Sequence, residues 1–184
     1  MASNRASRLT GTALLAALVI VFDYALKFSG LKIPFPWLPM LKFDFTGVPI
    51  ALSLFMYGLP SALTTSLVAF VGIVARSGDV LSAALKFAAE FSTVLGLALG
   101  IMLAGRFSDR AQKGSGLALG IVFRVAAMSV ANIFVLPLYG YPTEVAYGLL
   151  PLIAAFNVAS GAITVLLGAF LYEAIRKRFP TPRP

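Results

Sequence analysis

Residues 145–172, VAYGLLPLIAAFNVASGAITVLLGAFLY, form an apolar stretch of 28 residues without a charged side chain. A helix needs roughly 20 apolar residues to cross a hydrocarbon core about 30 Å thick, and this stretch exceeds that length. It nevertheless contains one carboxamide, Asn157. Because an unpaired amide in hydrocarbon costs a few kcal/mol, Asn157 predicts a partner inside the protein, either a neighbouring helix or a polar ligand.

The composition of the chain indicates an integral membrane protein. The chain is 59% hydrophobic and 12% charged, whereas soluble domains carry about 25% charged residues, and its mean hydropathy is +0.91. Its 184 residues suffice for a single membrane domain, residues 1–184, without a separate soluble domain. The absence of cysteine and histidine excludes disulfides, thiolate chemistry and the usual zinc sites. We therefore expect no metal site. We also expect no catalytic site and no bound cofactor.

The apolar windows predict an all-α bundle of six transmembrane helices. The expected spans cover residues 9–28, 48–57, 61–75, 80–103, 116–138 and 144–174. The second window is too short to cross unaided, so we expect it to be tilted or partly interfacial. The sequence Gly58-Leu59-Pro60 predicts a tight turn between the second and third helices, and residues 106–113 a basic polar loop.

A long extracellular loop is predicted between the first two helices, at residues 29–46. Its three prolines, Pro34, Pro36 and Pro39, exclude a regular helix. The loop is nevertheless apolar and contains Trp37. Either it lies at the membrane interface, where tryptophan is common, or it folds over the bundle as a lid, which would explain its length.

The distribution of Lys and Arg predicts that both termini are cytoplasmic, because basic loops stay on that side. The side of the termini would hold Arg5, Arg8, Arg106, Arg110, Lys113, Arg176, Lys177, Arg178 and Arg183. The other side would hold Lys27, Lys32, Lys42 and Arg76. The net charge of +8 is thus mostly explained by membrane topology and does not indicate nucleic acid as a partner.

Three polar residues of the last two spans are candidates for binding a ligand. Asn132 lies in the outer half of its span and Asn157 near mid-membrane, so both can reach a cavity opening outward beneath residues 29–46. Ser160 lies one turn after Asn157 on the same face. Asparagine offers donors and acceptors, which suits a neutral ligand with both on one edge. The alternative use of these groups is hydrogen bonding between helices.

Two pairs of charged residues lie within the predicted spans. Lys86 and Glu90 are four residues apart, and charges at such depth are expensive and usually functional. They form either a structural ion pair or a contact to substrate. Asp23 and Lys27, also four residues apart, are expected to pair with each other at the interface.

A stripe of small residues on the first span predicts a helical partner. Ala13 and Ala17 are four residues apart and therefore share a face. Such a smooth stripe lets another membrane helix approach closely.

Three segments and the overall layout resemble the substrate-capture subunit, or S component, of energy-coupling factor (ECF) vitamin transporters of the riboflavin type. Residues 41–49, LKFDFTGVP, resemble its Lys-Phe-Asp-Phe-Ser-x-x-Pro stretch. Residues 131–139, ANIFVLPLY, resemble its Asn-Tyr-Phe-x-x-Leu-Pro-Leu-Tyr. Residues 151–161, PLIAAFNVASG, resemble its Pro-Phe-Asn-x-x-Lys-Gly.

The resemblance implies capture of riboflavin, or a related flavin, from outside the cell. The family's two flavin-bonding asparagines fall on Asn132 and Asn157, and its lysine three residues further on is Ser160 here. The apolar end of a flavin would suit aromatic side chains of residues 29–46, and its pyrimidine edge a carboxamide. The predicted substrate-binding residues are Asn132, Asn157, Ser160, Phe43, Asp44, Lys42, Glu90 and Trp37.

The resemblance also implies partners. Ala13 and Ala17 match the face on which the family docks its membrane coupling (T) subunit. Energy would come from ATP hydrolysed by two separate ATPase subunits, and the chain itself would be a transport subunit of the cell membrane and not an enzyme.

Three other interpretations stay open. In the first, the chain is an S component for another heterocyclic vitamin or precursor. In the second, it is a small membrane enzyme acting on lipid, and in the third, an assembly protein whose polar groups serve only helix contacts. The enzyme would use Asp44, Glu90 and Arg124, although no nucleophile and base pair is visible in the sequence.

Overall fold

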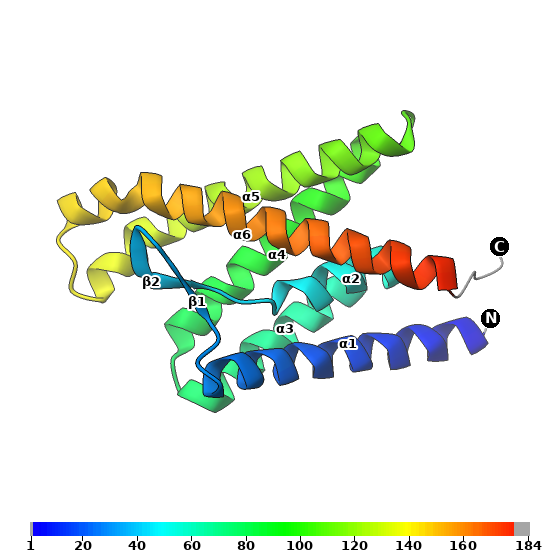
Figure 1. Cartoon of the computed structure of the whole chain (residues 1–184), viewed down its shortest axis with the longest axis horizontal. Helices are drawn as coiled ribbons and strands as arrows, with labels where there is room; N and C mark the ends of the chain where they lie inside the picture. The colour runs from blue at the N-terminus through cyan, green and yellow to red at the C-terminus, as the bar shows by residue number, and fades with distance from the viewer. Residues whose placement is uncertain (1, 179–184) are drawn as a thin grey trace.

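The computed structural model describes residues 2–178 of the chain (Figure 1). Its helices are α1 (Ala2–Phe28), α2 (Gly47–Tyr57), α3 (Leu59–Ser77), α4 (Val80–Leu103), α5 (Asp109–Leu138) and α6 (Thr143–Arg178). Two short strands, β1 (Ile33–Phe35) and β2 (Leu38–Phe43), lie between α1 and α2.

Five helices of the described region, all except α2, are long and apolar enough to cross a membrane. The 11 residues of α2 rise only about 17 Å, so the prediction of six full spans is not confirmed. Successive helices run in alternating directions, and the start of α1 and the end of α6 lie at the same end of the bundle (Figure 1). The chain is therefore a multi-pass membrane protein with five helices long enough to span, and α2 is a shorter apolar helix packed among them.

The segment predicted as an extracellular loop contains an antiparallel hairpin. The prediction that it holds no regular helix is confirmed for residues 33–43. The pairs are Ile33↔Phe43, Pro34↔Lys42 and Phe35↔Leu38. A two-stranded sheet has only edge strands, so the prolines cost it few ladder bonds. Leu38 of the hairpin packs against the buried cluster of Leu136 and Ile153 from α5 and α6, so the hairpin covers this end of the bundle.

The turn predicted at Gly58 is confirmed by the backbone. Helix α2 ends at Tyr57, α3 begins at Leu59, and Gly58 has φ 87°, a conformation that side chains disfavour. The start of α5 differs from its prediction. Instead of a loop through residue 113, the helix begins at Asp109, because the side chain of Ser108 accepts a hydrogen bond from Ala111 N and caps it.

Helices α4 and α5 are packed closely through glycines. A Cβ added at Gly96 would lie 2.4 Å from Leu119 O, and one at Gly100 would lie 2.4 Å from Ser115 O. The Ser115 hydroxyl also donates to Gly100 O at 2.8 Å. The backbones of the two helices therefore approach each other closely along this contact.

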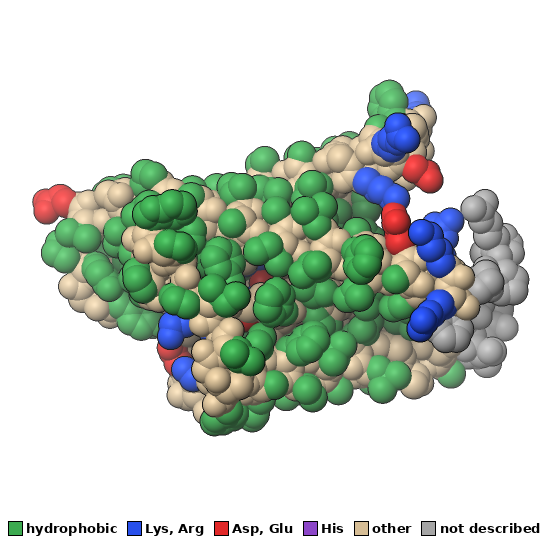
Figure 2. All heavy atoms as spheres, in the orientation of Figure 1, with side chains coloured by type: hydrophobic (Ala, Val, Ile, Leu, Met, Phe, Trp, Pro, Cys, Tyr) green, Lys and Arg blue, Asp and Glu red, His purple; other side chains and the backbone are tan. Residues whose placement is uncertain are grey.

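The surface follows the expected separation of apolar and basic residues. Figure 2 shows hydrophobic side chains over the middle of the visible face, with Lys and Arg gathered at the end where α1 begins and α6 ends. Arg183, one of the basic residues assigned to this side, lies outside the described residues. Which side of the membrane this end faces stays a prediction.

Candidate functional site

The centre of the bundle holds a buried guanidinium, that of Arg124 on α5, which is 2% exposed. Its Nε donates to Asn157 Oδ1 at 3.1 Å, and its Nη2 donates to Ser160 Oγ at 3.1 Å. On the α4 side, Nη1 lies 3.1 Å from Glu90 Oε1 and 3.1 Å from Thr93 Oγ1. Arg124 thus joins α5 to α4 and α6 in the interior of the protein.

The Lys86 and Glu90 side chains form the ion pair that their spacing allows. Lys86 Nζ lies 2.8 Å from Glu90 Oε1 and 2.6 Å from Asp44 Oδ1. Glu90 Oε2 is buried and has no hydrogen-bond partner among the described residues. It lies against Gly47, where an added Cβ would be 2.2 Å away, so a larger residue at the start of α2 would have to displace the Glu90 carboxylate.

Asp44 ties the end of the hairpin to this network. Its Oδ1 also accepts from the Thr46 hydroxyl at 2.7 Å, and its Oδ2 lies 3.7 Å from Lys32 Nζ. Burial alone would raise the pKa of Asp44, but the positive charges of Lys86 and Lys32 outweigh it and hold that pKa well below its ordinary value. The two lysines therefore favour the charged form of this carboxylate.

The expected pairing of Asp23 with Lys27 is wrong. Asp23 is buried and binds Lys32 Nζ at 2.9 Å and Arg76 Nε at 2.7 Å. Lys27 is exposed at the end of α1. Partners from the hairpin and from α3 satisfy the buried carboxylate from two sides, which a neighbour on the same helix turn would not.

These contacts form one continuous polar network across the protein. Its three acidic and four basic residues are Asp23, Asp44, Glu90, Lys32, Arg76, Lys86 and Arg124. The near balance of charge is what permits so many ions to be buried, since a lone buried charge is costly.

An aromatic cluster lies beside the polar network, between the hairpin and α6. Phe43 and Phe156 have ring centroids 4.9 Å apart, and Phe35 lies 5.6 Å from Phe156. Phe35 is 4% exposed. Since Phe156 directly precedes Asn157, the site joins an aromatic wall to a carboxamide.

The other predicted site residues are placed differently. Trp37 is 69% exposed and touches Phe35 edge-on at the tip of the hairpin, and Lys42 is exposed on β2. Asn132 is buried, and its Nδ2 donates to Met128 O on its own helix at 2.7 Å. The structure therefore gathers Asn157, Ser160, Phe43, Asp44 and Glu90 but shows no bond from Asn132, Lys42 or Trp37 to them.

Sequence reasoning left Arg124 out of the predicted substrate site, naming it only for the alternative enzyme. The signal that could have found it is its depth, because a lone arginine inside a span is expensive and needs partners. Thr93 and Thr46 carried no such signal, since threonine is common in membrane helices.

The predicted docking residues lie on the outside of the bundle. Ala13 and Ala17 are both exposed on α1, and Ala13 lines a groove of about 550 Å³ between α1 and α3. Among residues 2–178 no group of His, Cys, Asp and Glu side chains is arranged to hold a metal ion.

Comparisons with known proteins were made for both sequence and structure. No family model matches the sequence, and no curated protein matches it. A solved structure described as "Structure and mechanism of the S component of a bacterial ECF transporter" matches with a TM-score of 0.77 and 25% sequence identity, covering 95% of this chain and 98% of that chain. This chain therefore has the fold of an ECF transporter S component along nearly its whole length, and the comparison supports the S-component class.

Proposed function

We propose that this chain is the substrate-binding membrane subunit of an ECF-type vitamin uptake transporter and that it captures riboflavin or a related flavin. The match to an S component over 95% of the chain supports the class. S components are transport subunits, so the match to one confirms the prediction that the chain is not an enzyme.

One observation carries the assignment of a flavin to this site. Asn157 and Ser160 lie together in the interior, next to the aromatic pair Phe43 and Phe156. A flavin has the matching division between an apolar ring end and a pyrimidine edge with donors and acceptors. Its pyrimidine edge would share Asn157 Oδ1 with Arg124, or replace that contact.

The same site gives reason to keep a second substrate class. Ser160 stands where the riboflavin-type pattern has lysine, and its hydroxyl accepts from Arg124 instead. A planar guanidinium recognises a different set of acceptors from an ammonium group. Another heterocyclic vitamin or precursor is therefore the alternative substrate.

The partners of the proposed function are a membrane T subunit and two ATPase subunits. Ala13 and Ala17 would dock the T subunit, since both are exposed on α1 and small residues allow close helix contact. The basic end of the bundle would face the cytoplasm, and the hairpin would face outside.

The substrate assignment is tested by flavin binding to the purified protein. Riboflavin and flavin mononucleotide are titrated into the protein, with binding followed by quenching of flavin fluorescence. We expect binding by the wild type, loss of binding in Asn157→Leu, and unchanged binding in Val158→Leu, because Val158 is 45% exposed on the same helix. A protein that binds neither flavin would overturn the substrate assignment.

The docking assignment is tested separately by energised uptake. Replacing Ala13 and Ala17 by leucine should leave ligand binding intact and block uptake in cells that carry the coupling module. Uptake at the wild-type rate by this variant would move the docking surface away from α1.

A further inference from the structure

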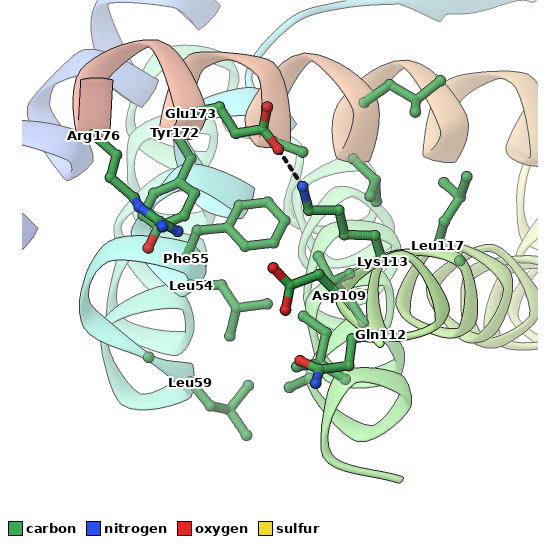
Figure 3. A pocket seen from close by; sticks show the side chains of 18 residues that line it. Leu54, Phe55, Leu59, Asp109, Gln112, Lys113, Leu117, Tyr172, Glu173 and Arg176 are labelled. Atoms are coloured by element: carbon green, nitrogen blue, oxygen red, sulfur yellow. Dashed lines mark hydrogen bonds and ion pairs between the residues drawn. The ribbon is translucent and has the colours of Figure 1, made fainter. Parts of the chain in front are cut away.

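A cavity lies at the basic end of the bundle and shares no lining residue with the candidate substrate site. It has a volume of about 670 Å³ and is lined by residues of α2, α4, α5 and α6 and by Leu59 at the start of α3 (Figure 3). This volume falls within the range of about 300–1,000 Å³ typical of ligand pockets. No member of the buried ion-pair network lines it.

The cavity separates two closely packed units. On one side, Gly116 of α5 is packed against Leu97 of α4, where an added Cβ would lie 2.8 Å from Leu97 Cδ1. On the other side, Phe55 of α2 stacks on Tyr172 of α6 with ring centroids 5.6 Å apart. Because each pair is held by its own contacts, the space between them is a feature of the fold.

The lining of the cavity changes from apolar to charged along α6. Its deep part is formed by apolar residues such as Leu54, Leu97 and Val165, and its mouth includes Asp109 and Arg176. From residue 165 to residue 176 a helix rises about 16 Å, which is close to half of a hydrocarbon core about 30 Å thick. The cavity therefore has the length and the polarity gradient of one membrane leaflet.

The mouth carries one anion and one cation without ion pairs. Lys113 of α5 and Glu173 of α6 bind each other across the opening, as the dashed line in Figure 3 shows. Among residues 2–178, no salt bridge is formed by Asp109 or Arg176, which lie on the α5 and α6 sides of the same opening. A headgroup with a phosphate and an ammonium group complements this pair.

We propose that this cavity binds one zwitterionic aminophospholipid, phosphatidylethanolamine, from the leaflet at the basic end. An acyl chain occupies the apolar depth, the phosphate contacts Arg176, and the ammonium group contacts Asp109. The lipid fills the space between the α4 and α5 pair and the α2 and α6 pair, and so supports the relative position of the two units.

The first test uses the full-length protein in micelles that contain equal amounts of phosphatidylethanolamine and phosphatidylglycerol with the same acyl chains. Native mass spectrometry then counts the lipids that stay bound after the detergent is removed. We expect one phosphatidylethanolamine on the wild type. Ala169→Leu, which fills the cavity wall, should lose it, whereas Ala155→Leu on the exposed face of α6 should retain it.

The second test addresses the headgroup with surface substitutions that spare the core. Arg176→Gln and Asp109→Asn should each lower lipid retention by up to about fivefold, since an exposed ion pair contributes up to about 1 kcal/mol. Arg178→Gln is the control, because Arg178 is exposed at the same end and does not line the cavity.

Four outcomes would overturn the proposal. The first two are a wild type that binds no lipid and a wild type that retains the two lipids equally. The third is lipid retention that neither Ala169→Leu nor Arg176→Gln changes. The fourth is a cavity filled only by a protein subunit that co-purifies with the chain. Flavin binding by Ala169→Leu should stay at the wild-type level, because Ala169 does not belong to the substrate site.

Discussion

Arg124→Met should be among the most damaging single substitutions in the interior of this protein. Methionine keeps a similar length but removes the charge and all five donors. Glu90 would keep only Lys86 as a cation, at 2.8 Å. The acceptors on Asn157 and Ser160 would lose their donor.

The size of the effect follows from the charge left behind. Removing one partner of a buried ion pair costs about 3–5 kcal/mol, because the remaining charge is uncompensated. Since Lys86 still contacts Glu90, we expect the lower end of that range, about 3 kcal/mol. One kcal/mol shifts the melting temperature by about 2–4 °C in a chain of this size, so the loss should be about 6–12 °C.

The explanation is tested with a double-mutant cycle. Circular dichroism at fixed detergent concentration gives the melting temperatures of Arg124→Met, Glu90→Gln and the double variant. If the unpaired carboxylate causes the damage, Glu90→Gln should restore part of the stability lost in Arg124→Met, with a coupling of roughly 1–3 kcal/mol.

Arg106→Met is the matched control, since Arg106 is exposed between α4 and α5 and should change stability by less than about 0.5 kcal/mol. The reasoning is refuted if Arg124→Met melts like this control. It is also refuted if the effects of Arg124→Met and Glu90→Gln simply add.

Two further predictions concern the packing of α4 on α5 and the anchoring of the hairpin. Gly100→Ala should lower the free energy of unfolding by about 1–3 kcal/mol through overpacking, since the new Cβ would lie 2.4 Å from Ser115 O. Gly114→Ala is the control, because a Cβ there meets nothing within 4 Å. Equal melting temperatures for the two variants would contradict this prediction. Because the pKa of Asp44 is lowered in the fold, its stabilising charge is present above the unfolded value of about 3.9 and is lost only as pH falls through the lower folded value. Asp44→Asn should therefore speed amide hydrogen exchange in the hairpin at neutral pH, and an unchanged exchange rate would exclude Asp44 as an anchor.

Helices were the most predictable part of this fold, because apolar windows determine where a chain can cross a membrane. Their ends were less predictable. The window for the fifth span began at residue 116, yet α5 begins at Asp109, since Ser108 caps a polar first turn that hydropathy alone marks as a loop. The hairpin was missed for a related reason. Three prolines exclude a helix, but they do not reveal that two edge strands can still pair.

The candidate site was predictable where position along a helix decides the matter. The shared face of Asn157 and Ser160 follows from their spacing, and both contact Arg124. The contacts of Arg124 with both α4 and α6 were not predictable, because the direction of a long side chain depends on the packing of its neighbours. The same holds for Asp23, which bonds Arg76 across 53 positions of sequence instead of the nearby Lys27.

The hairpin is held to the bundle by two kinds of contact that differ in the free energy needed to break them. At its base, Lys32 binds Asp23 and Asp44 binds Lys86, and breaking either leaves a buried charge. Along its inner face, Phe35 contacts Phe156, and an aromatic pair adds only about 0.5–1.5 kcal/mol beyond its buried area. A planar aromatic ligand can replace such ring contacts with equivalent ones, but it cannot replace the ion pairs. We therefore expect ligand entry to separate the aromatic face from α6 while the charged base of the hairpin stays in place.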